Sequence, residues 1–245
     1  MSRPKAPDVA LAPLDPHAGQ TLQEQVRDAL VRSLTEGYLG PDNQMTLRAI
    51  SVTYGTSIMP VREAVRELAS RHALDLLPNR TIRVPRLSRP EFDRVWRLRR
   101  LLEGEACAIA AISRAPAAMN RIRTNHQFSL AAIAGGDEKA IIRAGKQFLF
   151  SIYAESGDSI LISFIEALWL RSAPLFQINS EDGRREMVAI FGTTTPNDLA
   201  LIDALERGDA DHARLLRQKD LYELGEFISR FAMLDDLEDE SRESA

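Results

Sequence analysis

The chain of 245 residues has a single cysteine, Cys107, and no run of apolar residues long enough to span a bilayer. One cysteine cannot form an internal disulfide bond and cannot by itself build a cysteine-rich zinc site. The N-terminal residues also lack the uninterrupted apolar stretch of a secretory signal. These absences exclude a disulfide-stabilised scaffold and predict a cytoplasmic protein that does not associate with membranes.

The small net charge of −4 hides an uneven distribution. Residues 44–90 contain eight arginines and three acidic residues, a local charge of +5, so the remainder of the chain sums to −9. A basic segment attached to an acidic body indicates a polyanionic partner that binds at one end of the molecule.

Helix-start signals divide the chain into regions. The proline-rich residues 1–20 have no periodicity and predict a disordered tail. Thr21-Leu22-Gln23-Glu24 is a capping box that begins the first helix, and a second helix fits 46–54. Ser57 is expected to cap a third helix, which precedes two short strands around 78–80. Three helices and a hairpin over residues 21–87 predict a winged helix-turn-helix domain.

The second region, residues 88–234, begins at another capping box, Ser88-Arg89-Pro90-Glu91. The pattern of every later segment predicts a helix, and glycines mark the breaks between helices. Residues 235–245 are expected to form a short acidic tail. The expected fold is therefore mainly α: an N-terminal winged helix-turn-helix followed by an all-α bundle of about six helices.

Four stretches of sequence resemble a known family. Residues 54–68, YGTSIMPVREAVREL, resemble the GntR family of bacterial transcription regulators, with PVREA and the following hairpin as the specific part. Residues 99–103 and 152–158 resemble the FCD effector domain of its FadR subfamily, as do residues 201–209. The resemblance extends over residues 21–233 and implies a DNA-binding module joined to an effector-binding helical domain.

The third helix is the candidate for the major groove, where an arginine can donate two hydrogen bonds to guanine. Arg62 is the best candidate for reading a base, and Met59 for contact with a thymine methyl group, although a partly buried Met59 is an equal alternative. The resemblance adds further positions at the start of this helix, on the preceding helix and on the wing: Ser57, Arg48, Asn79 and Arg80. Ile58 stands where the family often has a DNA-contacting arginine, so the operator should differ from the usual one.

Many FCD domains resemble one another in a metal site of one aspartate and three histidines. The matching positions here are Gly145, Leu149, Asp198 and Asp220, and none of them is histidine. The four histidines of the chain lie at other positions without ligand spacing. We therefore expect no metal and no cofactor.

The remaining polar residues predicted for the effector site are Arg99, Arg171, Asp198 and Asp220. Asp220 interrupts an apolar helical stripe. The alternatives to ligand binding are an internal pair with an arginine such as Arg99 or Arg171, or a place on a partly exposed helix flank. Asp198 has an alternative in Thr195-Pro196-Asn197-Asp198, which reads as a capping box at a helix start. Arg99 also lies one helical turn from Glu103 and could simply pair with it.

These features predict a transcriptional regulator, expected to be a repressor, that binds an inverted-repeat DNA operator as a homodimer under control of a small-molecule effector. The alternative is a degenerate sensor whose bundle acts only in dimerisation or protein interaction. No zinc-protease helix, phosphate-binding loop or nucleophile elbow is present in the sequence, so it does not indicate an enzyme.

Overall fold

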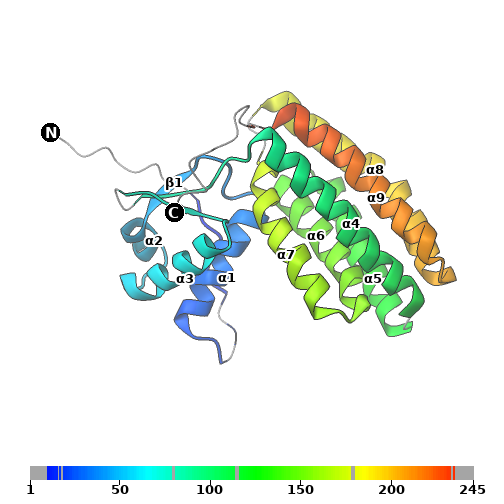
Figure 1. Ribbon diagram of the computed structural model, residues 1–245, viewed down its shortest axis with the longest axis horizontal. Coiled ribbons are helices and arrows are strands. Elements are labelled where there is room, and N and C mark those ends of the chain that lie inside the picture. The colour runs from blue at the N-terminus through cyan, green and yellow to red at the C-terminus, as the bar shows by residue number, and fades with distance from the viewer. Residues whose placement is uncertain are drawn as a thin grey trace. The chain divides into compact units, whose positions relative to one another are not determined.

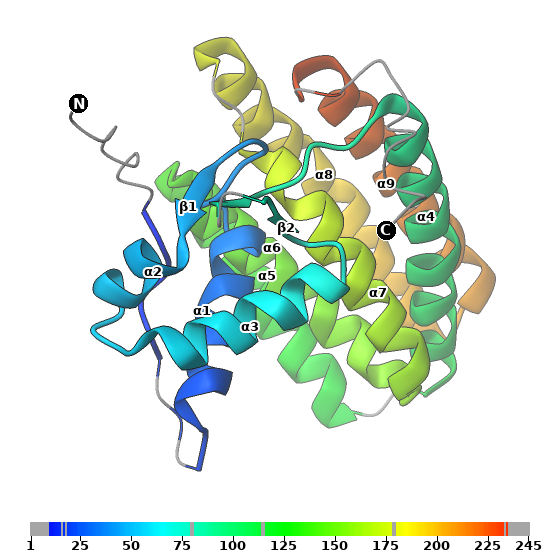
Figure 2. The same cartoon turned by 60° about the vertical axis from the view of Figure 1, so that its left-hand side comes forward.

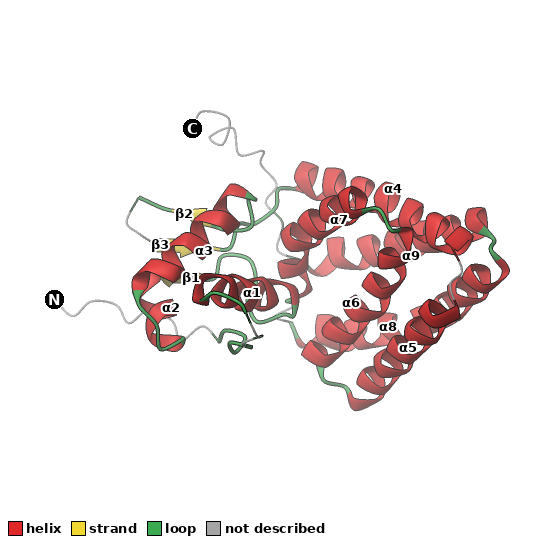
Figure 3. Ribbon diagram, turned by 90° about the horizontal axis from the view of Figure 1, so that it is seen from below, coloured by secondary structure: helices red, strands yellow, loops and turns green. Residues whose placement is uncertain are grey.

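The computed structural model describes residues 10–15, 17, 19–78, 81–113, 116–177, 180–232 and 234. The chain forms two compact units. The first contains the residues up to Leu87 and the segment Leu170–Gln177, and the second contains 88–169 and the residues from 178 onward. Figure 1 shows the elements of both units in chain order. The described residues are predominantly helical, and the strands belong to the first unit (Figure 3).

The N-terminal unit is built from α1 (Leu22–Thr35), α2 (Leu47–Thr53) and α3 (Ile58–Ser70). A small antiparallel sheet in the order β1-β3-β2 completes it, with β1 at Gln44–Thr46, β2 at Asp75–Leu76 and β3 at Thr81–Arg83. The register pairs Met45 with Ile82 and Leu76 with Ile82. This is the predicted winged helix-turn-helix, with β1 as a third strand that the sequence did not indicate.

Local sequence signals explain where these helices begin. The Thr21 hydroxyl accepts from the Glu24 amide, and the Glu24 carboxylate accepts from the Thr21 amide 2.7 Å away, which is the predicted capping box. Ser57 occupies the N-cap of α3, but its side chain makes no capping hydrogen bond, so that part of the prediction is wrong. The apolar faces of all three helices meet in one core that includes Leu30, Ile50 and Val65.

The first unit has two features that the sequence did not predict. Residues 10–15 were expected in a disordered tail, yet Ala12 is buried and its amide donates to Ser33 Oγ at 2.9 Å. The segment Leu170–Gln177 contributes Leu170 to the core of this unit. Gln177 Nε2 donates to the Tyr38 carbonyl at 3.3 Å, so this segment is bonded to the loop that follows α1.

The second unit is an all-α bundle. Its helices are α4 (Arg89–Ser113), α5 (Pro116–Gly135), α6 (Glu138–Tyr153), α7 (Ser159–Ser172), α8 (Glu181–Arg207) and α9 (Ala210–Phe231). Short 3-10 turns follow α6 at Ala154–Ser156 and α7 at Ala173–Phe176. The second capping box is present, because the Glu91 carboxylate accepts from the Ser88 amide at 3.0 Å. The last residues of α7 belong to the first unit.

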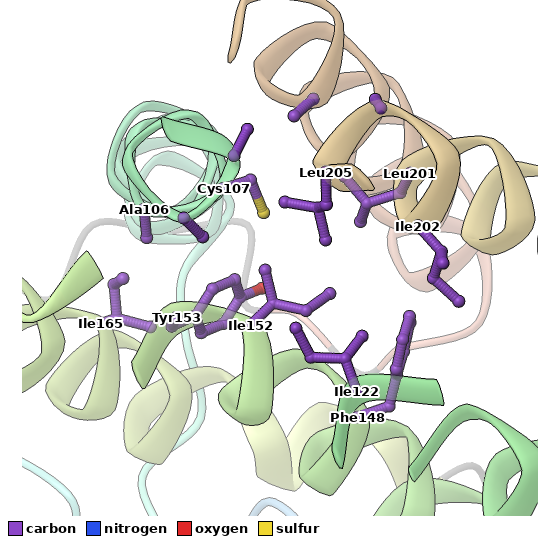
Figure 4. Packing of buried hydrophobic residues seen from close by; sticks show 14 of the residues in the cluster. Ala106, Cys107, Ile122, Phe148, Ile152, Tyr153, Ile165, Leu201, Ile202 and Leu205 are labelled. Atoms are coloured by element: carbon purple, nitrogen blue, oxygen red, sulfur yellow. The ribbon is translucent and has the colours of Figure 1, made fainter. Parts of the chain in front are cut away.

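The core of the bundle takes residues from all six helices, α4 to α9. Figure 4 shows Cys107 of α4 facing Ile152 and Tyr153 of α6, with Leu205 of α8 above them. Phe148 and Ile122 close the core on the side of α5. Burial raises the pKa of the Cys107 thiol to about 12, so this cysteine is a neutral packing residue.

One segment in the described residues, Ser159–Phe176, is long and apolar enough to cross a membrane by length and composition alone, with a mean hydropathy of 1.4. A core helix passes the same test, and 44% of this segment is buried. Its residues Ile165 and Trp169 belong to the core of the bundle, which accounts for much of its apolar character.

Two glycines inside helices of the bundle give a matched test of packing. A Cβ added at Gly225 would lie 2.4 Å from Cδ1 of Trp96, whose ring is buried and stacks on Phe92 at 4.5 Å. A Cβ at Gly145 would meet open space. We expect Gly225→Ala to lower the free energy of unfolding by about 1–3 kcal/mol through overpacking.

The control, Gly145→Ala, should raise the free energy of unfolding by about 0.5–1 kcal/mol, because alanine favours helix more than glycine does. Urea denaturation followed by circular dichroism measures both. Equal stability of Gly225→Ala and wild type would contradict the close approach of α4 and α9 at Trp96.

Candidate DNA-binding surface and interior charged site

The exposed face at the start of α3 carries three of the predicted DNA-binding residues. Ser57, Met59 and Arg62 are all exposed, and Met59 retains 57% of its accessible surface. More than half of the Met59 surface is therefore open to solvent on this face. The opposite face of α3 packs Val61, Val65 and other apolar residues into the core, which holds the helix in place.

Arg48 is exposed on α2, which precedes α3 in the helix-turn-helix (Figure 2). The guanidinium groups of Arg48 and Arg62 form no ion pair with any residue in the described part of the chain. Arg66, by contrast, pairs with Glu63 at 3.0 Å on the same helix. The predicted wing residues Asn79 and Arg80 lie outside the described residues.

The interior of the helical unit contains a buried charged cluster centred on Glu103. Arg99 Nε donates to Glu103 Oε1 at 2.6 Å, and both side chains are inaccessible to solvent. Arg217 of α9 donates through Nε to Glu103 Oε2 at 3.2 Å, and the Tyr153 hydroxyl donates to the same oxygen. Burial alone would raise the pKa of Glu103, but the two guanidinium groups outweigh it and lower that pKa to about 2.

Arg99 is further held by two aromatic rings. Its Cζ lies 5.1 Å from the centre of the Trp96 ring and 4.4 Å from that of Trp169. Cation–π attraction of this kind strengthens when the cation is withdrawn from water. The Arg99–Glu103 pair is thus a buried structural element joining α4 to α7.

Asp220 joins this cluster through a partner that the sequence did not suggest. Its carboxylate pairs with Arg217, three residues earlier on α9, and not with Arg99 or Arg171 as expected. Burial raises the pKa of Asp220, and Arg217 opposes that effect. Arg217 was missed because it lies beside the apolar stripe of α9, although its spacing from Asp220 is a recognisable pairing signal.

The capping box predicted at Thr195–Asp198 is wrong. Helix α8 runs without interruption over Glu181–Arg207, so Asp198 lies in its middle and caps nothing. Burial, and then the charge of Asp220, raise the pKa of Asp198 to about 8, with Arg217 acting in the opposite direction. The Asp198 carboxyl group therefore carries a proton at neutral pH.

His126 of α5 reaches the same place from a distant part of the sequence. The side chain is 4% exposed, and its Nε2 lies 3.9 Å from Asp198 Oδ2. Its ring contacts Phe148 of α6 with 5.2 Å between centroids. Burial, and then Arg123, lower the pKa of His126, so the imidazole is neutral at pH 7. The sequence gave no signal for this contact, because histidines were judged on their spacing alone.

Of the four predicted effector residues, the structure brings three into the helical unit: Arg99, Asp198 and Asp220. Arg171 falls in the Leu170–Gln177 segment, which is grouped with the N-terminal unit. No group of three or more histidine, cysteine, aspartate or glutamate side chains in the described residues could hold a metal ion.

Comparison with known proteins agrees with this architecture. The family described as bacterial regulatory proteins of the gntR family matches residues 22–84, and the FCD domain matches residues 94–221. The HTH-type transcriptional regulator McbR of Escherichia coli is 32% identical over 158 residues, covering 64% of this chain and 71% of that protein. A probable D-xylose utilization operon transcriptional repressor of Paenarthrobacter nicotinovorans is 30% identical over 199 residues. The match covers 79% of this chain and 84% of that protein.

Solved structures resemble the chain over most of its length. E. coli McbR/YncC has a TM-score of 0.80 with 26% identity, covering 86% of this chain and 98% of that one. A GntR regulator from Rhodococcus has a TM-score of 0.69 with 18% identity, which supports the fold. With a winged helix-turn-helix followed by a helical bundle, and with both domain families matched in that order, the chain belongs to the GntR family of transcriptional regulators and carries an FCD domain.

Proposed function

We propose that this regulator binds an inverted-repeat operator as a homodimer and that a small molecule bound in the helical unit changes its affinity for DNA. The observation that carries the DNA-binding part is the exposed face formed by Ser57, Met59 and Arg62 on α3 with Arg48 on α2. An arginine without an internal carboxylate partner is available for guanine or phosphate. Repression is inferred from the relative that is described as a repressor. Such a protein acts in the cytoplasm, where the chromosome lies.

Two-fold symmetry supports the proposed operator. One winged helix offers few base contacts, so a dimer that reads two half-sites gains both affinity and specificity. Selection of bound sequences from a random DNA pool tests the proposal directly. Enrichment of an inverted repeat is expected, and enrichment of no sequence would overturn it.

Arg62→Ala should weaken binding to the selected operator by about ten- to a hundredfold, because a lost bidentate base contact costs about 1–3 kcal/mol. Its affinity for random DNA should change less. Fluorescence anisotropy at physiological salt measures both affinities.

Arg185→Ala is the matched control, since it removes one exposed arginine from α8 and leaves α3 untouched. Operator binding by Arg185→Ala should equal that of wild type. If Arg62→Ala behaved like this control, the placement of α3 in the major groove would be wrong.

The proposed dimer uses an apolar surface on α4 and α7, helices that Arg99 and Trp169 join and that lie side by side in Figures 1 and 2. Large apolar side chains are exposed on both helices: Leu98, Leu101, Ile160 and Phe164. Exposed large apolar side chains on neighbouring helices are typical of a protein interface. A second copy of the chain is its expected partner, since self-complementary faces form two-fold dimers.

The double variant Leu101→Glu/Phe164→Glu should be monomeric, because it would bring four carboxylates into that interface. Leu215→Glu, at an exposed apolar position on α9, should remain dimeric. Light scattering after size-exclusion chromatography gives the masses. A dimer in the double variant would place the interface elsewhere.

A further inference from the structure

The interior site of the helical unit has one carboxyl group more than its cations can balance. Its arginines, Arg99 and Arg217, are buried and already bonded to Glu103 and Asp220. Asp198 is the additional carboxyl group, and no ion pair joins it to either arginine in the described part of the chain. While Asp198 is protonated, the two arginines balance Glu103 and Asp220. Once Asp198 ionises, its negative charge has no counter-ion among these groups, and a bound cation would balance it.

His126 provides a second, independent observation. It is more than nine-tenths buried, and its Nε2 has no hydrogen-bond partner among the described residues. That nitrogen lies 3.9 Å from Asp198 Oδ2, beyond direct hydrogen-bonding distance. Two acceptors at this separation can both lie about 2.9 Å from a single nitrogen atom placed between them.

The site is partly accessible to solvent. The side chains of Asp198 and Asp220 retain 16% and 15% exposure, so solvent reaches the carboxyl groups. A small solute can therefore approach from the surface.

We propose that the effector is an organic cation whose primary ammonium group donates hydrogen bonds to Asp198 Oδ2 and His126 Nε2. The inference rests on the proposed function, because it names the chemical class of the effector for the same helical unit. A neutral imidazole protonated at Nδ1 presents a lone pair at Nε2, and the ionised Asp198 presents a negative charge. The absence of a metal-binding group in the described residues distinguishes this site from a metal centre.

Binding should release a proton. Since burial and Asp220 raise the pKa of Asp198 to about 8, the empty site holds a proton at pH 7, and the ammonium group would replace it. An alkylammonium group stays charged over this range because its pKa is near 10. The affinity for the ammonium ligand should therefore rise about tenfold from pH 6 to pH 7 and level off above pH 8.

The charged and titratable side chains around Asp198 in this cluster come from four helices. They are His126 from α5, Arg99 and Glu103 from α4, Tyr153 from α6, and Arg217 and Asp220 from α9.

The test uses the full-length protein with three probes of equal length: n-butylammonium, butan-1-ol and butyrate. Butylammonium should raise the melting temperature by about 3–6 °C at about ten times its dissociation constant, and the other two should have no effect. Calorimetry in two buffers of different ionisation enthalpy should show close to one proton released at pH 7. Stabilisation by butyrate, no stabilisation by butylammonium, or binding without proton release would each overturn the inference.

Two variants assign the contacts. Asp198→Asn keeps the shape of the side chain and should bind butylammonium at least tenfold more weakly, with no proton release. Asp203→Asn on the same helix, whose side chain is exposed, should match wild type. Trimethylbutylammonium, which has the charge but no N–H donor, should also bind at least tenfold more weakly than butylammonium. If the two bound equally well, His126 Nε2 would not accept a hydrogen bond from the ligand.

A further arm tests the metal alternative. Zinc chloride should not stabilise the protein, and an EDTA-reversible stabilisation lost in Asp198→Asn would replace the ammonium site by a metal site. DNA selection on the same sample separates the two proposals. If an inverted repeat is enriched but butylammonium does not bind, only the effector inference fails, whereas the absence of any enriched sequence overturns the regulator model independently.

Discussion

Glu103 carries a full negative charge where no solvent reaches it, and the helical unit is organised around keeping that charge compensated. Removing one partner from a buried ion pair typically costs about 3–5 kcal/mol, because the remaining charge is left without water or a counter-ion. Arg99 from α4, Arg217 from α9 and Tyr153 from α6 all bond to this one carboxylate. The three helices must therefore meet in a single register, which apolar packing alone would specify less strictly.

This constraint decides what else the interior can do. Arg99 and Arg217 are both bonded to Glu103, and Arg217 also pairs with Asp220. The resemblance to FCD domains implied a metal ligated by histidines, but Gly145 and Leu149 occupy two of those positions here. Asp198, at a third of these positions, lies 3.9 Å from His126 of another helix. The residues at these positions therefore differ from those that the resemblance implied, while the fold is that of the family.

Short-range signals account for the parts of the structure that the sequence predicted well. The capping boxes at Thr21 and Ser88 begin α1 and α4, since each depends on residues only three positions apart. The same reasoning failed at Thr195, where a cap-like pattern with Pro196 lies inside the long helix α8. A motif that ends or begins a helix in isolation can be overridden by the packing of both flanking segments.

The interior site could be predicted only in part, because its members come together across long sequence separations. Asp198, Asp220 and Arg99 were found through their positions in the family pattern, and the spacing of Arg99 from Glu103 indicated the alternative, an internal pair. His126 lies 72 residues from Asp198, by subtraction of their numbers, and no local pattern connects them. Arg171 was assigned to the site by its charge, but the break of α7 at Pro174 belongs to a segment of the other unit.

That segment bears on how a ligand could affect DNA binding. A ligand shifts an equilibrium only to the extent that it binds one state better than another, so the two units need a shared element. Helix α7 is such an element, since Trp169 belongs to the helical unit and Leu170 to the core of the N-terminal unit. Trp169 stacks on Arg99, Arg99 bonds to Glu103, and Glu103 bonds to Arg217, the partner of Asp220. Within the helical unit, Asp220 is therefore connected to Trp169 of α7 through Arg217, Glu103 and Arg99.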